Sequence, residues 1–263
     1  MSDFLKLKSV IENISGISIE AAKDYLIESR LTPLLKKHKL ENLKGLETLL
    51  IKGAKMELIQ DVVDQIVTPE TRFFRDEKMF SVLEKDIFPE WFATENKVSL
   101  LSAGSSTGQE AYSLAMLIKA SLPYYFDRVT IHGVDISKKS IDKARRAQYS
   151  EFEVSRGLSS SMRDQFLQAK NGSFHVTPKI SSKVTFQQLN LLKDSLPGRY
   201  DIIFFRNVAI YFSEANKKAV FQSIHHALKK NGILVIGSSE SLQGLNELYE
   251  VFTLQGCYFY RKI

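Results

Sequence analysis

The stretch Val98-Ser-Leu-Leu-Ser-Ala-Gly-Ser-Ser-Thr-Gly-Gln-Glu110 decides the predicted fold of this 263-residue chain. It opens with a short apolar run that is typical of a buried strand, and a helix is expected from Gln109 to about residue 122. The small residues in between let a ligand approach the backbone closely, and the helix N-terminus supplies free N–H groups. Gly104 and Gly108 have neither the spacing of a dinucleotide fingerprint nor the Gly-Lys-Ser/Thr ending of a P-loop. A nucleoside therefore fits this loop better than a polyphosphate.

Strands and helices alternate through the rest of the C-terminal part. This alternation predicts a parallel sheet with helices on both faces, and a terminal hairpin adds an antiparallel edge. Residues 150–182 leave two alternatives open, a loop or a small inserted sheet, because only 174–178 alternates like a short strand. The expected strands are 129–135, 183–189, 201–205 and 233–236, the expected helices start at 137 and span 216–228, and the hairpin covers 250–252 and 256–261.

Residues 1–66 show only helical periodicity. Apolar residues recur three and four positions apart, as in Leu58, Ile59, Val62, Val63 and Ile66, which predicts a small all-α domain. One helix is expected to begin near residue 18, and Thr32-Pro33 predicts a break in it.

Composition excludes several classes of protein. Hydrophobic residues make up 44% of the chain and charged residues 25%, which is typical of a globular protein. The single cysteine, Cys257, excludes an internal disulfide framework and a multi-cysteine zinc site, and His225-His226 lacks partners at metal-ligand spacing, so no metal is expected. No secretory signal and no apolar run long enough to cross a bilayer is visible, so we expect a cytoplasmic protein without membrane insertion.

The net charge of +6 suggests an acidic partner, either nucleic acid or an acidic protein surface. Within 30–55, seven basic residues face only Glu41 and Glu47, which is either a docking face or an ordinary solvated surface. The seven are Arg30, Lys36, Lys37, Lys39, Lys44, Lys52 and Lys55.

Polar residues at the ends of the predicted strands are the candidate ligand-binding groups. Asp135 ends the second strand, where an acidic residue either accepts hydrogen bonds from ribose hydroxyls or caps the next helix. Arg206 and Asn207 follow the strand over 201–205, at the sheet edge where open α/β proteins bind ligands, so the pair is either a ligand-binding or a structural pair. For Glu110, the spacing Thr107-x-x-Glu110 favours a capping box at the helix start. Tyr211 is either a site residue or a packing aromatic.

Four ordered motifs closely resemble the chemotaxis receptor glutamate methyltransferases, the CheR-type family, over nearly the whole chain. They are Thr-x-Phe-Phe-Arg at 71–75, Ser-Ala-Gly-x-Ser-Thr-Gly-x-Glu-x-Tyr-Ser-Leu-Ala-Met at 102–116, Arg-Asn-Val-x-Ile-Tyr-Phe at 206–212, and Gly-x-Ser-Glu-Ser-Leu at 237–242. The resemblance implies a Rossmann-like S-adenosylmethionine-dependent methyltransferase sheet over 91–263, a linker over 67–90, and a small β-subdomain inserted near 157–185.

The resemblance also implies a function and its residues. S-adenosyl-L-methionine would be the cofactor, S-adenosylhomocysteine the product, and glutamates on the acidic helices of a chemoreceptor's cytoplasmic signalling domain the substrate. Arg75 and Tyr211 would lie near the transferred methyl group. The residues expected around the cofactor are Thr71, Arg75, Ala103, Gly104, Glu110, Asp135, Asn190, Leu191, Arg206 and Asn207.

The chain departs from the family pattern at four positions. Pro69 replaces an Asn two residues before the first motif, and its missing amide predicts weaker cofactor binding. The other three departures are expected to affect the site less: Ser105 replaces a Cys, Gln109 a Glu, and Ala111 a Pro.

Three rival functions differ in class. A nucleic-acid methyltransferase would suit the basic charge, but the chain has no Asp/Asn-Pro-Pro-Tyr/Phe signature and no Pro-Cys pair, so no nucleic-acid partner is expected. A non-catalytic module that binds S-adenosylmethionine is the main alternative, and Pro69 favours it. An NAD-dependent oxidoreductase lacks the glycine spacing.

Overall fold

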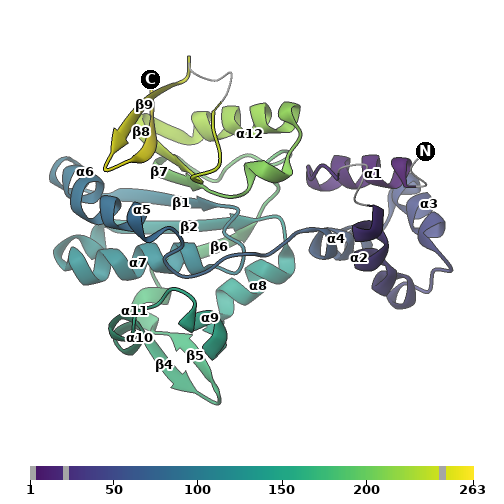
Figure 1. The fold of residues 1–263 in the computed structure, drawn as a ribbon, viewed down its shortest axis with the longest axis horizontal. Helices are drawn as coiled ribbons and strands as arrows, with labels where there is room; N and C mark the ends of the chain where they lie inside the picture. Colours follow the sequence, from purple (N-terminus) through teal and green to yellow (C-terminus); the bar gives the residue numbers. More distant parts are fainter. Residues whose placement is uncertain (1–3, 20–23, 243–246) are drawn as a thin grey trace.

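The computed structural model describes residues 4–19, 24–242 and 247–263. Its centre is a seven-stranded sheet in the order β6-β2-β1-β7-β8-β10-β9 (Figure 1). The first five strands in this order run parallel, and β10 is antiparallel to both β8 and β9. The α/β class with an antiparallel C-terminal edge is therefore confirmed. The strands are β1 (Val98–Ala103), β2 (Val129–Asp135), β6 (Val184–Gln188), β7 (Tyr200–Phe205), β8 (Leu228–Ile236), β9 (Tyr249–Leu254) and β10 (Cys257–Lys262).

Helices cover both faces of the sheet, and β7 shows how the two apolar cores divide. Ile202 and Phe204 pack in the core on one face, and Ile203 and Phe205 pack in the core on the other. Every residue of β7 is buried, as expected for a central strand of a parallel sheet. The first face carries α5 (Glu77–Val82), a π-helical turn (Leu83–Ile87), α6 (Phe88–Thr94), α7 (Gln109–Ser121), a 3₁₀ turn (Pro123–Arg128) and α8 (Lys138–Arg146), and the second carries a 3₁₀ turn (Ala209–Tyr211) and α12 (Glu214–Ala227).

The segment left open by the sequence supplies two strands of a second sheet, which has three antiparallel strands in the order β3-β5-β4. Asn171 and Gly172 join β4 to β5 with φ angles of 50° and 71°, the left-handed conformation that a tight hairpin turn requires. Asn and Gly are the residues that adopt this conformation at least cost, so the local sequence sets the turn. The elements here are β3 (Gln148–Tyr149), α9 (Glu151–Ser155), α10 (Ser160–Phe166), β4 (Leu167–Lys170), β5 (Ser173–Val176) and α11 (Pro178–Ser181).

The N-terminal helices form an all-α domain with its own apolar core. The predicted break at Thr32-Pro33 is wrong, because Pro33 lies inside α2. Proline removes one helical hydrogen bond, but the neighbouring Leu31 and Leu34 are buried in this core and hold the helix continuous. The helices are α1 (Leu5–Ser15), α2 (Asp24–Lys37), α3 (Leu43–Gly53) and α4 (Met56–Ile66), and part of the expected start of the second helix lies outside the described residues.

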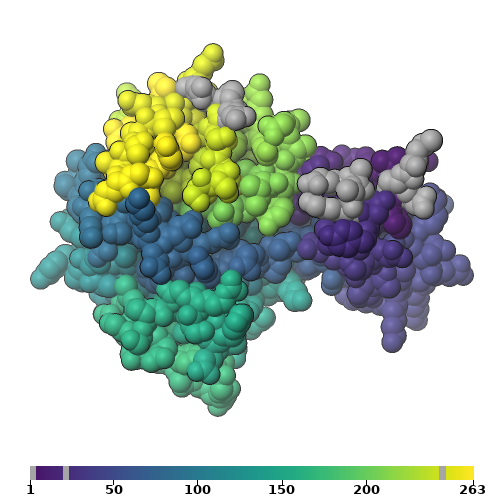
Figure 2. All heavy atoms as spheres, in the orientation of Figure 1, coloured from purple at the N-terminus to yellow at the C-terminus, as the bar shows by residue number. Residues whose placement is uncertain are grey.

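Figure 2 shows the N-terminal helices and the small sheet as two lobes that project from the main α/β body. The N-terminal lobe lies beside the ends of the parallel strands, next to α8 and α12, and residues 67–76 run back from it along the sheet domain (Figure 1). Among the described residues, no helix is long and apolar enough to cross a membrane.

Candidate functional site

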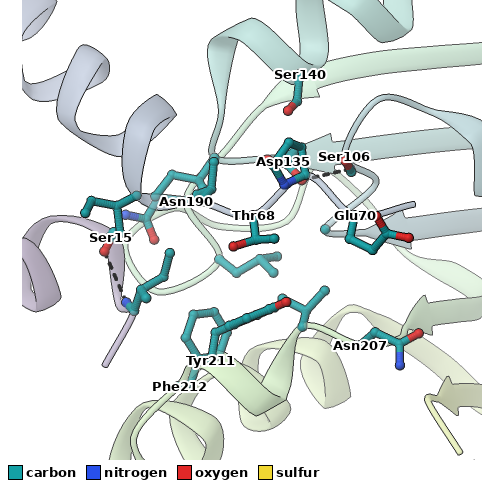
Figure 3. Close-up of a pocket in the computed structure, with 18 of the residues that line it drawn as sticks. Ser15, Thr68, Glu70, Ser106, Asp135, Ser140, Asn190, Asn207, Tyr211 and Phe212 are labelled. Carbon is teal, nitrogen blue, oxygen red and sulfur yellow. Dashed lines mark hydrogen bonds between the residues drawn. The ribbon is translucent and has the colours of Figure 1, made fainter. Parts of the chain in front are cut away.

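A cavity of about 220 Å³ lies between the carboxyl edge of the sheet and the N-terminal helices (Figure 3). A water molecule needs only about 10–15 Å³ of such space, so there is room for an organic ligand. We call it the interdomain cavity, since three parts of the chain enclose it. They are the N-terminal domain (Ser15, Ile17, Ser18, Ile19, Leu26, Arg30, Ile66), the linker (Val67 to Glu70), and the loops after β1, β2, β6 and β7 (Gly104, Ser106, Asp135, Ile136, Ser140, Leu189, Asn190, Leu191, Arg206, Asn207, Val208, Tyr211, Phe212).

The glycine loop after β1 forms one wall of the cavity. Gly104 has a φ of +77°, and a Cβ atom placed there would lie 2.4 Å from Cγ2 of Val208, so only glycine fits. The N–H groups of Gly104 and Ser105 both donate to the carbonyl of Val134 on β2, at 2.8 and 2.9 Å, which fixes the loop against the neighbouring strand. The hydroxyl of Ser106 is buried, lines the cavity and has no hydrogen-bond partner among the described residues. Such a group needs a partner, and a polar ligand would supply it.

Asp135 closes the adjacent wall at the end of β2. Its carboxylate accepts hydrogen bonds from the backbone N–H of Ser106 at 2.8 Å and of Ser137 at 2.9 Å. Burial raises the pKa of Asp135, while these backbone hydrogen bonds oppose the rise. Each carboxylate oxygen keeps acceptor capacity beyond its one backbone bond. Asp135 can therefore accept hydrogen bonds from the hydroxyl groups of a ribose in the cavity.

The N-terminal domain closes the opposite side through specific contacts. The backbone N–H of Ser18 donates to the carbonyl of Tyr211 at 2.8 Å, and Ile17 forms a β-bridge with Phe212. On α4, Asp64 accepts a hydrogen bond of 2.6 Å from the hydroxyl of Ser137, two residues after Asp135. These contacts tie the N-terminal helices to the loops after β2 and β7, so this domain is a structural part of the cavity.

Arg206 lies beneath the linker, where it connects three parts of the chain by hydrogen bonds. Its side chain is only 2% exposed, and its guanidinium donates to Glu110 at 2.8 Å, to Asp76, and to the carbonyl of Arg75 at 3.0 Å. The arginine thus joins the strand edge, the start of α7 and the 71–76 motif in one charged network. Asp76 and Phe74 have φ angles of 66° and 47°, so the motif makes sharp turns around this network.

Seven of the predicted site residues line the cavity, and four do not. Asn190 lines it, but its side-chain amide also donates to the carbonyl of Ile14 at 3.0 Å, so it holds the N-terminal domain as well. Arg75 lies behind the rim, with Nη1 3.5 Å from the carbonyl of the lining residue Glu70. The lining residues are Gly104, Asp135, Asn190, Leu191, Arg206, Asn207 and Tyr211, and those outside are Thr71, Arg75, Ala103 and Glu110.

The capping box favoured at Thr107-x-x-Glu110 is wrong. The residue that precedes α7 is Gly108, which makes no side-chain cap, and the carboxylate of Glu110 instead accepts hydrogen bonds from Ser102 and Arg206 at 2.8 Å. A buried guanidinium is a stronger partner for a carboxylate than the backbone N–H of a helix end. Glu110 therefore acts on the cavity indirectly, by holding Arg206.

Glu240 has a wider role than the turn that its Gly-Ser-Ser-Glu-Ser context indicates. Its carboxylate accepts three backbone hydrogen bonds, from Asn207 at 2.7 Å, Val208 at 3.1 Å and Gly237 at 2.8 Å. Asn207 has a φ of 59°, so the carboxylate holds the cavity-lining loop after β7 in a left-handed turn. Asp/Glu followed by small residues is too common a pattern to predict this contact from the sequence. The N-terminal lining residues, such as Arg30, carry no local signal either.

Replacing Glu240 with Gln should weaken binding of S-adenosylhomocysteine by about tenfold, because an amide keeps one acceptor oxygen and turns an N–H donor toward the backbone N–H groups. Isothermal titration calorimetry would measure the change, and Ser239→Ala, an exposed neighbour in the same turn, is the control. Equal affinity of the Gln variant and the wild type would show that the loop does not depend on the carboxylate.

The described residues contain no group of three or more His, Cys, Asp or Glu side chains that could hold a metal ion. The polar residues that line the cavity instead supply hydroxyls, two amides, two carboxylates and two arginines. This donor set suits an organic ligand with ribose hydroxyls and a charged amino-acid end.

Comparisons with known proteins point to the same family over nearly the whole chain. Residues 69–257 match the family model described as CheR methyltransferase, SAM binding domain, and residues 2–66 match CheR methyltransferase, all-alpha domain. The chain is 38% identical to chemotaxis protein methyltransferase 1 of Vibrio cholerae, over 92% of this chain and 90% of that protein. It is 34% identical to chemotaxis protein methyltransferase 1 of Pseudomonas aeruginosa, over 99% and 97%, and 33% identical to chemotaxis protein methyltransferase Cher2 of Pseudomonas putida, over 95% and 94%. With both family models matched and relatives similar over nearly their full length, this chain belongs to the CheR methyltransferase family.

Proposed function

We propose that this protein uses S-adenosyl-L-methionine to methylate glutamate side chains on the cytoplasmic signalling domain of a chemoreceptor. The observation that carries the proposal is the interdomain cavity at the carboxyl edge of a CheR-family sheet. It is lined by the half-buried Asp135 and by Ser106, whose buried hydroxyl has no hydrogen-bond partner among the described residues. The related proteins are named chemotaxis protein methyltransferases. These names support a chemoreceptor substrate and do not support a non-catalytic role.

The residues of the cavity fit the cofactor. Asp135 would accept the ribose hydroxyls, and the neighbouring Ser106 would offer its hydroxyl, which has no partner among the described residues. Gly104 has no side chain, so a ligand can approach the backbone of the loop closely. Asn207, Leu191 and the linker would enclose the remainder of the cofactor, whereas Thr71, Ala103 and Glu110 would act from behind these residues.

A carboxylate substrate explains why the cavity needs no strong base. S-adenosylmethionine supplies a methyl group on a positively charged sulfur, which makes it susceptible to attack by an oxygen nucleophile. A glutamate with a pKa near 4.3 is already ionised at neutral pH, so the protein only has to position it and exclude water. Tyr211 lines the cavity, and Figure 3 shows its ring extending into the space. We assign Tyr211 and Arg75 to orienting the glutamate. Arg75 lies outside the cavity lining, with Nη1 3.5 Å from the carbonyl of Glu70, and would turn inward to meet the substrate.

Arg75→Ala should lower kcat for methyl transfer by about 10- to 100-fold, because the variant loses a charged hydrogen-bond donor to the carboxylate. The side chain of Arg75 is partly exposed and makes one long hydrogen bond within the described part of the chain, so folding should be unchanged. A labelled-methyl assay on receptor signalling fragments would measure the loss. Arg72→Ala removes an exposed arginine from the same motif and serves as the control. Near wild-type turnover by a folded Arg75→Ala variant would reject the assignment.

The basic residues of 30–55 divide into two groups in the structure. Arg30 is turned inward, hydrogen-bonded to Ile66 and Thr68, and Lys37 and Lys44 pair with carboxylates on their own domain. The remaining four are exposed and have no ion-pair partner among the described residues: Lys36, Lys39, Lys52 and Lys55. We propose that this smaller group, with a local surplus of positive charge, meets the acidic receptor helix.

Reversing two of these charges, Lys36→Glu with Lys39→Glu, should raise KM for the receptor fragment by about three- to tenfold at low salt. The difference should shrink as the salt concentration rises, because exposed charges are screened. Steady-state kinetics at several salt concentrations would measure it, with Lys193→Glu and Lys218→Glu together as a control of equal charge change. If the two double variants had the same KM, the N-terminal domain would not be the docking face.

A further inference from the structure

Two lysines lie over one aromatic ring at the edge of the sheet opposite the interdomain cavity, and a third lysine lies near one of them. The ammonium of Lys119, in the last turn of α7, lies 5.0 Å from the centre of the Phe126 ring. The ammonium of Lys183, the residue before β6, lies 5.3 Å from the centre of the same ring. Lys179 belongs to α11, which packs against α7 (Figure 1). We call Lys119, Lys179 and Lys183 the lysine cluster.

The three positive charges crowd one another. Burial and the neighbouring ammonium of Lys179 lower the pKa of Lys119, with a further contribution from Lys183. One lysine above an aromatic ring is a common and favourable contact, but two on one ring with a third beside them repel. Within the described residues, only Asp127 offsets this charge. Its carboxylate lies 3.2 Å from the ammonium of Lys183, and its own side chain is 94% exposed.

We propose that the lysine cluster is a second binding site, which takes a phosphate-bearing anion. Three ammonium groups less one carboxylate leave a charge of +2, which a phosphate with a charge near −2 at neutral pH would balance. Lysine ammonium groups bind phosphate as point charges, and the shared ring of Phe126, itself buried, gives two of them a rigid support. An anion between the lysines would turn their mutual repulsion into attraction.

The site is separate from the cofactor cavity. Lys183 precedes β6, and the cavity-lining residue Leu189 follows it, so the two sites lie at opposite ends of one strand. Six residues of extended chain place them about 20 Å apart. A ligand at the lysine cluster therefore cannot be the cofactor or the methyl acceptor.

Calorimetric titration of the full chain with pyrophosphate tests the proposal. Wild type should bind it, and Lys119→Ala with Lys179→Ala should weaken binding by about tenfold or more, since each lost charged hydrogen bond has a large effect. Asp127→Asn should strengthen binding, because it removes the one negative charge at the site. Lys218→Ala, an exposed lysine on α12, is the control and should change nothing.

A parallel titration with S-adenosylhomocysteine distinguishes binding at the lysine cluster from binding in the interdomain cavity. The lysine variants should bind it as the wild type does, whether or not the assignment of the cofactor cavity is correct. Sedimentation with phosphatidylglycerol vesicles then distinguishes two sources of the anion. Vesicle binding that the lysine variants lose would identify a lipid headgroup, and pyrophosphate binding alone would identify a soluble phosphate. Pyrophosphate affinity that is absent, or that is the same in wild type and the Lys119/Lys179 variant, would overturn the proposal.

Discussion

Asp135→Asn should weaken the binding of S-adenosylhomocysteine by about 30- to 100-fold, which is the cost of losing about one charged hydrogen bond to a ribose hydroxyl. The Asn side chain has nearly the same shape, but its amide oxygen can serve only one of the two backbone N–H groups that Asp135 holds. Its NH₂ group cannot accept from a ribose. Calorimetry would measure the affinity, and Asp164→Asn, an exposed carboxylate in α10, is the control.

The same variant should affect the stability of the ligand-free protein much less. Because burial raises the pKa of Asp135, its ionised form destabilises the fold at neutral pH, and that penalty is relieved as the pH falls through the folded-state pKa. Asp135→Asn removes the penalty but leaves one backbone N–H without its acceptor, so its melting temperature at pH 7 should stay close to that of wild type. Ligand affinity of the wild type should fall over the same acidic range, because binding needs the ionised carboxylate. Unchanged affinity in the variant would remove Asp135 from the site.

Arg206→Met should lower the free energy of unfolding by about 3 kcal/mol, because it leaves two carboxylates without their buried partner. The side chain is 2% exposed, and the partners Glu110 and Asp76 are 15% and 36% exposed, so water relieves part of the cost. The melting temperature should fall by about 6–12 °C. Binding of S-adenosylhomocysteine should be lost as well, since the network holds the linker above the cavity.

A double variant separates the network from simple loss of packing. Adding Glu110→Gln to Arg206→Met removes one of the stranded charges, so the pair should be less destabilised than the sum of the single variants. Thermal denaturation of the four proteins gives the coupling directly. Strict additivity would mean that Arg206 and Glu110 do not stabilise one another, contrary to their 2.8 Å contact.

Most of the sheet could be predicted because its signals are local. The apolar run over 201–205 and the loop from Gly104 to Gly108 each indicate their own structure from adjacent residues. Pro33 and Glu110 were mispredicted for the same physical reason, because a distant contact outweighed a local preference. Leu31 and Leu34 pack in the helical core, and Arg206 approaches Glu110 from the end of another strand.

The site was only partly predictable for a related reason. Strand-end residues such as Asp135 and Asn207 follow from the topology of a parallel sheet, which gathers carboxyl ends at one edge. The part of the cavity formed by the N-terminal domain could not be predicted from the sheet topology. No local pattern links Asn190 to Ile14 or Asp64 to Ser137. The family resemblance supplied Arg75, and the structure places it at the rim rather than in the lining.

The central claim is that the interdomain cavity holds the cofactor, and a crystal structure of the full chain with S-adenosylhomocysteine tests it most directly. We predict the adenosine inside the cavity, with its ribose hydroxyls within hydrogen-bond distance of Asp135 and the ligand's sulfur facing Tyr211. A ligand bound elsewhere, or a cavity filled by side chains while Arg75 points into bulk solvent, would contradict the account.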